Sequence, residues 1–314
     1  MTLSVIILSW NTRELTRQCL KSIYDNAKDL DYEVIVVENG SSDDSADMVA
    51  GEFPQVKLIR NSENLGFTKG NNQGFKDSRG EYILFLNSDT IVPVSENKKS
   101  QLCKMIEAME KDKFIGALTS KLLNPDGSFQ WEFYRKIPNL SRTFWVYLAP
   151  FNKLTHSIKF LRKRYLVDID ENKSQVLEDA NAPGAALLMS REAHKKIRGR
   201  DENIFYWMED VDLWFSLREA GYKLYYLADA EIIHYGAASS AMWDDLRKML
   251  DFRTGYVYVF RKHKGRFQGF IVKWMFILNA LLTAPFLLVL GLIKRKYWSK
   301  GVVTLKFVWK FMRV

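Results

Sequence analysis

The sequence predicts an α/β fold, a mostly parallel sheet flanked by helices, followed by a C-terminal membrane-associated helical segment. Over the first 90 of the 314 residues, short apolar runs alternate with segments of helical periodicity. Runs that are apolar at every position are typical of strands buried on both faces. Strand–helix alternation at this spacing indicates helices on both sides of a parallel sheet. Residues 263–314 differ from this pattern, because they combine a long apolar run with basic flanks.

Four strands are expected in the N-terminal part of the chain. They are Leu3 to Leu8, Glu33 to Val37, Val56 to Ile59 and Tyr82 to Leu86. A helix with Thr12 as its N-cap is expected after the first strand, because a threonine just before an apolar-periodic segment is a typical helix start. Ser41 to Ser45 is expected to be a capping turn, and Asn64 to Gly74 a loop that leads into a helix.

Polar residues directly follow three of these strands. Their sequences are Ser9-Trp10-Asn11, Glu38-Asn39-Gly40 and Asn87-Ser88-Asp89. In parallel α/β sheets, ligands bind beyond the carboxyl ends of the strands. We therefore expect a ligand site at this edge of the sheet, although local turns and caps would also explain these residue types.

The pattern is less regular in the second half of the chain. From Asn124 to Glu178 the periodicity is weak and aromatic and basic residues are frequent, so loops and short helices over the site are expected. The later elements expected are a strand at Ala185 to Met189, a helix at Asp210 to Ala220, strands at Tyr222 to Leu227 and Glu231 to His234, and a helix at Ala241 to Arg261.

Charge is distributed unevenly along the chain. The formal net charge is +9, but Phe252 to Val314 contains 13 lysine and arginine residues and no acidic residue, so residues 1–251 carry a net charge of −4. The positive charge thus belongs to the tail. Because it flanks an apolar run there, it favours an anionic membrane surface over nucleic acid as a partner.

The two cysteines, Cys19 and Cys103, belong to no CxxC pair and no Cys/His cluster. They indicate neither a disulfide framework nor a zinc site, and they fit a reducing, cytosolic setting. The N-terminal sequence MTLSVIILSWN has no charged n-region and no cleavage site. We therefore expect a buried strand there rather than a signal peptide.

Asp89 and His234 are candidate metal ligands. Asp89 ends an apolar strand where a parallel sheet opens to ligand, and a carboxylate there can hold Mg²⁺ or Mn²⁺ while diphosphate oxygens complete the shell. His234 also ends an expected strand, and a neutral imidazole could join that shell. The alternatives are a strand-end turn for Asp89 and a hydrogen-bonded core residue for His234.

Three carboxylates, Glu209, Asp210 and Asp212, open an expected helix directly after the aromatic run Phe205-Tyr206-Trp207. A partly desolvated setting raises the pKa of a carboxyl group towards that of a useful general base. Such a base would let a sugar hydroxyl attack an anomeric carbon. Acidic residues also favour helix N-termini through the macrodipole, without any catalytic role.

Two further loops could contact a nucleotide. The glycines between Asn64 and Gly74 let the backbone approach a ligand, the helix start offers N–H groups to phosphate, and Lys69 adds charge. Neither a P-loop nor a G-x-G-x-x-G sequence is present, which disfavours P-loop NTPases and dinucleotide-binding folds. Glu38 could accept a hydrogen bond from a base or a ribose. An ordinary capped loop and a turn with an N-cap at Ser41 or Ser42 are the alternatives.

These motifs, in this order, resemble the family 2 glycosyltransferases of bacteria, in particular the rhamnosyltransferase-like branch that builds cell-wall and surface polysaccharides. The segments that carry the resemblance are SWN, VVENGSSDDS, NLGFTKGNNQG, LNSDT, PGAALLMSREA, EDVDLWFSLREAG, HYGAASS and FRTGYVYVFRKHKG. The resemblance covers about residues 1–262 and is weak from Asn124 to Glu178. It implies a catalytic domain with the GT-A fold at 1–262, with a nucleotide-sugar half at about 1–120 and an acceptor half at about 121–262.

The resemblance also implies roles for individual residues. Asp89 resembles the metal-binding aspartate of a DxD-like motif, and His234 resembles the histidine that completes the shell around Mg²⁺ or Mn²⁺. Asp210 resembles the catalytic base, with Glu209 beside it. The implied nucleotide-sugar positions are Ser9, Trp10, Asn11, Glu38, Gly66, Lys69, Asn71, Asn87 and Ser88. Asn87 replaces the first aspartate of the motif, and Glu38 stands where an aspartate is usual.

The reaction implied is an inverting single displacement. Asp210 would remove the proton of an acceptor hydroxyl while the metal neutralises the departing diphosphate. By resemblance the expected donor is dTDP-rhamnose, with UDP sugars next. Two alternatives stay open: a non-catalytic, membrane-tethered nucleotide-sugar-binding protein, and a sugar nucleotidyltransferase, which would need a Gly-rich basic loop after the first strand, where Ser9-Trp10-Asn11-Thr12 stands instead.

The tail, residues 263–314, is expected to associate with a membrane. Trp274 to Ile293 is 20 residues long without a charge, enough to span a bilayer, although Pro285 at its centre weakens a simple span. Val302 to Met312 resembles an interfacial helix. Basic flanks on both sides favour monotopic or re-entrant attachment at the cytoplasmic face of the bacterial inner membrane, which suggests a lipid-linked saccharide acceptor. A buried core helix is the alternative.

Overall fold

The structure is a computed structural model, and it describes all residues except 96–98, 149–156, 166–168, 182, 237–242 and 314. The chain divides into two compact units. Unit 1 comprises Met1–Arg135, Asp168–Phe205 and Glu209–Ala241. Unit 2 comprises Lys136–Val167, Tyr206–Met208 and Met242–Val314.

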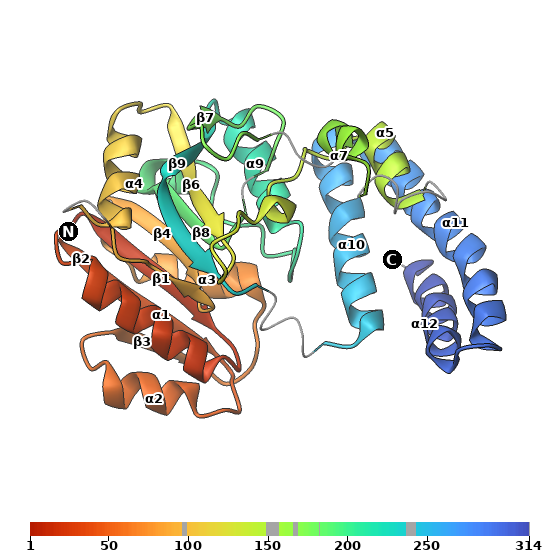
Figure 1. The fold of residues 1–314 in the computed structure, drawn as a ribbon, viewed down its shortest axis with the longest axis horizontal. Helices are drawn as coiled ribbons and strands as arrows, with labels where there is room; N and C mark the ends of the chain where they lie inside the picture. Colours follow the sequence, from red (N-terminus) through yellow and green to blue (C-terminus); the bar gives the residue numbers. More distant parts are fainter. Residues whose placement is uncertain (96–98, 149–156, 166–168, 182, 237–242, 314) are drawn as a thin grey trace. The chain divides into compact units, whose positions relative to one another are not determined.

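Unit 1 is built on a nine-stranded mixed sheet (Figure 1). The strands are β1 (Leu3–Ser9), β2 (Tyr32–Asn39), β3 (Lys57–Asn61), β4 (Tyr82–Asn87), β5 (Thr90–Ile91), β6 (Ile115–Leu123), β7 (Gln175–Val176), β8 (Ala186–Ser190) and β9 (Lys223–His234). Their order is β3-β2-β1-β4-β8-β6-β9-β5, and β7 pairs with β9 beside this path. The pairs among β1 to β4 and the β6–β9 pair are parallel, whereas β5, β7 and β8 run antiparallel to their neighbours. The predicted α/β fold is confirmed.

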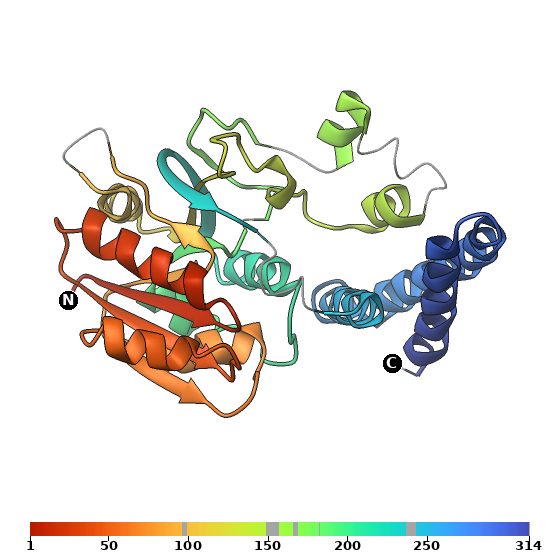
Figure 2. The ribbon, with the colours of Figure 1, turned by 60° about the horizontal axis from the view of Figure 1, so that its bottom comes forward.

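Helices α1 (Arg13–Asn26) and α3 (Phe67–Lys76) cover opposite faces of this sheet. Successive strand residues point to opposite faces. Ser9 of β1 hydrogen-bonds Thr16 of α1, which lies along the sheet in red in Figure 2. Ile6 of the same strand faces α3 instead, where a Cβ added to Gly74 would lie 2.5 Å from its side chain. Glycine at position 74 therefore lets α3 approach the sheet closely.

In its described part, unit 1 contains four further helices and one 3₁₀ turn. They are α2 (Ser45–Glu52), α4 (Gln101–Glu110), the 3₁₀ turn η1 (Trp131–Phe133), α8 (Arg191–Lys196) and α9 (Glu209–Glu219). Ser100 and Ser190 cap α4 and α8, because each hydroxyl accepts a backbone N–H of the first turn. Thr12 occupies the N-cap position of α1, but its side chain does not cap the helix. The capping part of that prediction is wrong, because the hydroxyl is bonded to other side chains instead.

One long strand replaces two that we predicted. Tyr222 to Leu227 and Glu231 to His234 form the single strand β9, which pairs in parallel with β6. The register shifts between Ser120 and Lys121 of β6, because Leu227 and Glu231 of β9 pair with these neighbouring residues. The extra residues of β9 are accommodated as a bulge, so the chain need not leave the sheet.

The segment between β6 and β8 consists of short elements, as its weak periodicity predicts. Unit 1 contributes η1 and β7 to it. Unit 2 contributes α5 (Leu140–Thr143), the π-helical turn η2 (Phe144–Leu148) and α7 (Lys159–Tyr165).

Three long helices form most of unit 2. They are α10 (Asp245–Lys264), α11 (Arg266–Gly291) and α12 (Arg295–Phe311). Helix α10 begins after Asp244, whose side chain accepts the N–H of Arg247, and the predicted start at Ala241 lies outside the described residues. The aromatic rings of Tyr256, Phe276 and Phe307 form the buried core between the three helices.

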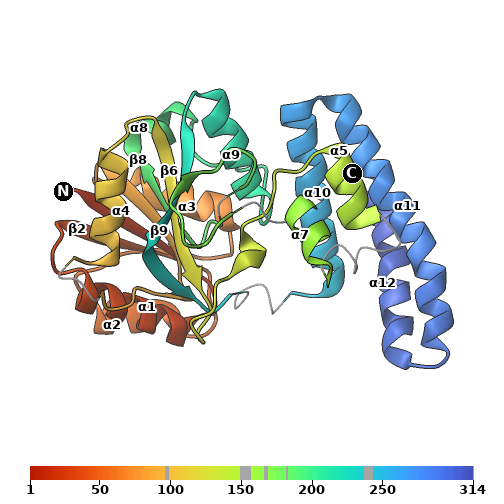
Figure 3. The same cartoon turned by 45° about the horizontal axis from the view of Figure 1, so that its top comes forward.

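Helices α11 and α12 form an antiparallel hairpin (Figure 3). Lys273 near the start of α11 hydrogen-bonds the carbonyl of Met312 just beyond the end of α12, at 3.2 Å. Gly291 at the end of α11 lies against the backbone of Trp298 near the start of α12. The chain therefore returns along α12 to the end from which α11 began.

The outer side of the hairpin is apolar. Among the described residues, α11 is the one helix that is long and apolar enough to cross a membrane by length and composition. Its side chains Leu282, Phe286 and Val289 are 65%, 64% and 62% exposed. This exposure disagrees with the alternative of a buried core helix.

Candidate functional site

Asp89 and His234 meet at one edge of the sheet. Asp89 follows β4, and His234 is the last residue of β9. The short strand β5 joins them, because Thr90 pairs with His234 and the backbone N–H of Tyr235 donates to the carbonyl of Asp89. The Oδ1 atom of Asp89 lies 3.4 Å from Nε2 of His234, and both side chains are buried.

The side chain of Gln130 determines which nitrogen of His234 carries the proton. Its amide group donates to the carbonyl of His234 at 2.6 Å and to Oδ1 of Asn124 at 2.8 Å. Its Oε1, an acceptor, lies 3.0 Å from Nδ1 of His234. Nδ1 therefore carries a hydrogen, and in the neutral ring Nε2 is left as an acceptor towards Asp89.

Two acceptors that face each other favour a positive centre between them. Nε2 of a neutral imidazole and a carboxylate oxygen both suit a divalent cation, and a metal-binding histidine usually donates its other ring N–H to a hydrogen-bond acceptor. The residues fit a metal in this respect. In the part of the chain that the structure describes, no group of three or more His, Cys, Asp or Glu side chains is arranged to hold a metal.

A cluster of hydroxyl groups lies beside Asp89. Ser88 bonds to Thr12 at 2.9 Å, and Ser9 bonds to both Thr12 and Thr16. All four side chains are buried. Asn87 is anchored next to them by its backbone, because its N–H donates to the carbonyl of Ala185.

The neighbouring strand ends form a second group. Glu38 is buried and accepts the backbone N–H of Ser41 at 2.8 Å. Asn11, at φ 51°, donates its backbone N–H to Ser41 and accepts from the N–H of Ser42. The loops after β1 and β2 therefore fix one another, with Trp10 between Ser9 and Asn11.

Gly66 marks a close approach between two loops. Its φ is +88°, and an added Cβ would lie 2.7 Å from the ring of Phe205. The first N–H of α3, that of Phe67, donates to the carbonyl of Phe205, so this N–H is not available to a phosphate, contrary to our expectation. Asn71 is buried and donates to the carbonyl of Phe67, whereas Lys69 is exposed.

Asp210 lies in the first turn of α9 and is held on both carboxylate oxygens. The backbone N–H of Gly184 donates to Oδ2 at 2.8 Å, and Nη1 of Arg200 lies 3.4 Å from Oδ1. About a fifth of the side chain (21%) remains accessible. Since each carboxylate oxygen has two lone pairs, both could still accept a proton.

Glu209 and Asp210 differ in protonation. Burial, and then the negative charge of Asp210, raises the pKa of Glu209 to about 8. Burial also raises the pKa of Asp210, while Arg200 and the N–H of Gly184 oppose that rise. Asp210 is therefore the member of the pair that ionises first, and Glu209 stays protonated at neutral pH.

The two carboxylate sites are linked through adjacent strands. Gly184 contacts Asp210, and the next residue, Ala185, accepts the N–H of Asn87, which precedes Ser88 and Asp89. The structure thus brings Asp89, His234 and Asp210 to the same edge of the sheet.

Gln130 and Arg200 are the side chains that sequence reasoning missed. Gln130 lies in the segment with weak periodicity, and Arg200 lies in a connection between α8 and α9. No pattern in the sequence marks either residue. Gln130 contacts His234, which is 104 residues away, and Arg200 contacts Asp210, which is 10 residues away.

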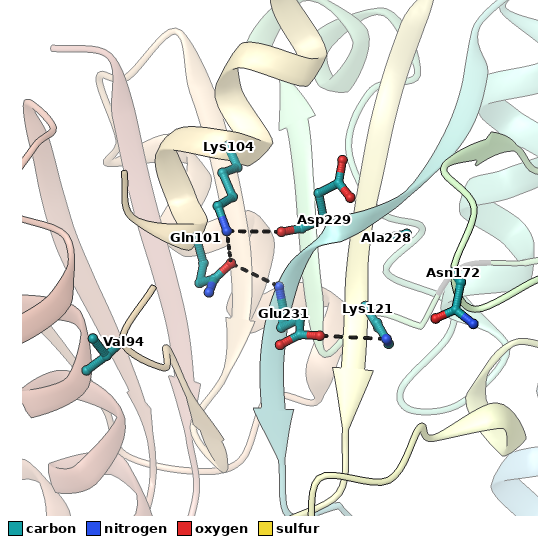
Figure 4. A pocket seen from close by; sticks show the side chains of 8 residues that line it. All are labelled: Val94, Gln101, Lys104, Lys121, Asn172, Ala228, Asp229 and Glu231. Carbon is teal, nitrogen blue, oxygen red and sulfur yellow. Dashed lines mark hydrogen bonds and ion pairs between the residues drawn. The ribbon is translucent and has the colours of Figure 1, made fainter. Parts of the chain in front are cut away.

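A separate cavity of about 400 Å³ opens on unit 1 (Figure 4). It is lined by Val94, Gln101, Lys104, Lys121, Asn172, Ala228, Asp229 and Glu231. Three of its charged side chains contact its own lining, since Lys121 faces Glu231 and Lys104 donates to the backbone carbonyl of Asp229. It contains none of the predicted site residues.

The chain is similar to known glycosyltransferases. The sequence profile described as "Glycosyl transferase family 2" matches residues 4–198. An N-acetylglucosaminyl-diphospho-decaprenol L-rhamnosyltransferase of Mycobacterium tuberculosis (strain ATCC 25618 / H37Rv) is 25% identical over 249 residues, which cover 74% of this chain and 76% of that protein. Rhamnosyltransferase WbbL of Escherichia coli (strain K12) is 24% identical over 238 residues, covering 74% and 82%.

Solved structures share the fold. The mannosyltransferase PcManGT from Pyrobaculum calidifontis, in complex with GDP-Man and Mn²⁺, matches with a TM-score of 0.55 at 15% identity, covering 99% of this chain and 86% of its own. GalNAc-T7 with UDP, GalNAc and Mn²⁺ matches with a TM-score of 0.56 at 15% identity, covering 83% and 48%. At these identities the similarity concerns the fold alone.

Proposed function

This chain belongs to glycosyl transferase family 2, and from that premise we propose that it moves a sugar from a nucleotide-diphosphate donor to an acceptor hydroxyl with inversion. The observation that carries the proposal is the arrangement of Asp210 beside Asn87-Ser88-Asp89 at one sheet edge. An inverting displacement needs a base for the acceptor and a positive centre for the leaving diphosphate, and this edge offers candidates for both.

Asp210 is the proposed general base. The acceptor oxygen attacks the anomeric carbon, the new C–O bond forms as the bond to the diphosphate oxygen breaks, and the hydroxyl proton passes to Asp210. Asp210 ionises before Glu209 and its side chain is 21% accessible, and both properties support this role. Glu209, which is protonated at neutral pH, is proposed to lie beside the base without taking the proton.

Asp89 and His234 are the proposed ligands of a divalent metal, Mg²⁺ or Mn²⁺. When bound, the metal would supply positive charge for the departing diphosphate. Gln130 supports the proposal, because it leaves Nε2 of His234 free to bind a cation. The solved structures of PcManGT and GalNAc-T7 contain Mn²⁺, which agrees with this proposal.

The donor is proposed to bind across the strand ends. The residues assigned to it are Ser9, Trp10, Asn11, Glu38, Gly66, Lys69, Asn71, Asn87 and Ser88. The hydrogen bonds among the loops after β1, β2 and β4 support a preformed site. Rhamnose is the sugar that the names of the two relatives suggest.

The hairpin α11–α12 is proposed to attach the protein to the cytoplasmic face of a bacterial inner membrane, as a monotopic or re-entrant anchor. Its antiparallel course and exposed apolar side chains support this. Exposed Lys300, Lys306 and Lys310 along α12 suit an anionic surface. The decaprenol in one relative's name then suggests a lipid-linked saccharide acceptor in cell-surface polysaccharide synthesis. Within this proposal, residues 1–262 are the catalytic domain.

Product analysis tests the proposal. Membranes containing the full chain are supplied with a panel of nucleotide sugars, and glycolipid products are identified by mass spectrometry. We expect a product with one added sugar from one donor in the panel, formed about 10²- to 10⁴-fold more slowly by the Asp210→Asn variant. Donor binding without transfer or hydrolysis for any sugar would instead favour the non-catalytic binding protein.

A further inference from the structure

Arg200 is an internal cation beside the proposed base. Its side chain has no solvent exposure, and its guanidinium group lies over the rings of Phe85 at 4.9 Å and Phe67 at 5.3 Å. Nη1 faces Oδ1 of Asp210 at 3.4 Å. In the described part of the chain, Nε and Nη2 have no hydrogen-bond partner.

A buried arginine of this kind is costly for the fold. Removing a charge from water carries a penalty of several kcal/mol, which a carboxylate partner offsets only if the geometry is good. Here the carboxylate contact is long and two nitrogens are unpaired. Cation–π contacts with two rings recover part of the penalty, but an apolar side chain would fill this place at lower cost. The position is therefore poorly explained by stability alone.

The charged groups around this contact come from several elements. Glu209 and Asp212 accompany Asp210 on α9, and His194 of α8 packs against Phe85, the ring that Arg200 also contacts. His194 is buried with both ring nitrogens unpaired in the described residues, and the charges of Arg200 and Arg191 help to keep it neutral. The backbone N–H of Gly184 faces Asp210 from the start of β8. Arg200 is thus the cation that contacts Asp210 directly.

We propose that Arg200 is a positioning residue, whose buried positive charge orients the carboxylate of Asp210 beside Glu209 and favours its charged form. The inference rests on the proposed role of Asp210 as the base. Glu209 opposes the ionisation of Asp210 if it loses its own proton, and burial opposes it in any case. The fixed positive charge of Arg200 acts in the other direction, and the N–H of Gly184 fixes the second oxygen.

The pH dependence of kcat tests this role. A base is active when unprotonated, so kcat rises with pH through the pKa of Asp210, and loss of the neighbouring positive charge moves that rise to higher pH. Arg200→Met and Arg200→Gln should move the acidic limb of the kcat profile to higher pH by about one unit. This is the lower end of the shift of about one to three pKa units that a nearby opposite charge causes. Arg200→Lys, which keeps the charge, should leave the limb close to that of the wild type.

Arg191→Met is the matched control. Arg191 stacks on Phe75 and donates to the carbonyl of Gly80, so it is another partly buried arginine near His194 without contact to Asp210. Its loss should lower Tm without moving the acidic limb. Tm is measured for each variant to show that it is folded. If Arg200→Met does not fold, Arg200→Gln takes its place in the comparison.

Three results would overturn the inference. Arg200→Gln could lower kcat with an unmoved limb, Arg191→Met could move the limb equally, or Arg200→Lys could be inactive although it is folded. The proposed function fails separately, through Asp210→Asn. If Asp210→Asn retains wild-type turnover, the base assignment is lost and Arg200 with it; if it is inactive and the Arg200 limb is unmoved, only the role of Arg200 is lost.

Discussion

The backbone N–H of Gly184 donates a 2.8 Å hydrogen bond to Oδ2 of Asp210, and a Cβ at Gly184 would lie 2.5 Å from Oδ1 of the same carboxylate. The residue that holds the proposed base therefore also leaves no room for a side chain of its own. Since the next residue, Ala185, accepts the N–H of Asn87, the same backbone segment links Asp210 to the Asp89 side of the site.

Gly184→Ala should lower kcat while leaving donor affinity unchanged. The methyl group displaces the carboxylate of Asp210, and misplacement of a catalytic group by about 1 Å can cost about 10²-fold in rate. Steady-state kinetics with titration of the donor checks both quantities. Gly51→Ala is the control, because nothing lies within 4 Å of a Cβ there, and it should retain wild-type kcat. Equal kcat in the two variants would contradict the proposed arrangement.

Gln130→Leu should weaken the response to metal. Leucine removes the acceptor for Nδ1 of His234, so the tautomer with Nε2 free is no longer selected, and loss of such a partner typically costs about 10- to 100-fold in metal affinity. Activity is measured against Mn²⁺ and Mg²⁺ concentration. Asn124→Leu, which removes an acceptor for the amide of Gln130 but not the contact with His234, should have a smaller effect. An unchanged metal requirement in Gln130→Leu would disprove the proposed tautomer.

His194 should make the fold sensitive to acid. Burial, with the charges of Arg200 and Arg191, lowers the pKa of His194 to about 3, whereas the unfolded chain binds this proton below about pH 6.5. The stability is therefore fully present above pH 6.5 and is lost as pH falls towards 3, by about 2 kcal/mol at pH 5. His194→Leu should remove this loss.

Urea denaturation at pH 7 and pH 5 checks the role of His194. The difference in unfolding free energy between the two pH values should be smaller in His194→Leu than in the wild type. An identical difference in the two proteins would show that His194 binds its proton equally well in the folded and the unfolded state.

The double substitution Leu282→Lys, Phe286→Lys should release the protein from membranes. Both side chains are about two-thirds exposed on α11, and burial of each in lipid contributes about 1.5–3 kcal/mol. Vesicles with and without anionic lipid are sedimented with the full chain, and binding should fall by at least about tenfold. Phe114→Lys, an exposed apolar residue of unit 1, should bind like the wild type. Undiminished binding of the double variant would refute the hairpin as the anchor.

The sheet, and the positions of Asp89 and His234 at its edge, could be predicted because they depend on local sequence. Apolar runs define the strands, and the residues just after them, such as Asp89, must lie at the carboxyl edge of a parallel sheet. His234 was found in the same way, although β9 is one strand where we expected two. The resemblance to known transferases then selected Asp210 from three carboxylates at a helix start.

The partners of these residues could not be predicted. Gln130 reaches His234 across 104 residues, and Arg200 reaches Asp210 from the connection between α8 and α9. Thr12 illustrates the same limit, since its position predicts a cap but its hydroxyl is bonded to Ser88, which is 76 residues away. Such contacts depend on tertiary packing, which local patterns do not encode.

Asp210 is proposed to accept the proton of the acceptor hydroxyl. The most direct measurement compares wild type and Asp210→Asn for donor binding and for sugar transfer under saturating donor. The account predicts unchanged donor affinity with transfer about 10²- to 10⁴-fold slower, the usual effect of removing a general base. Transfer by Asp210→Asn at the wild-type rate would contradict it.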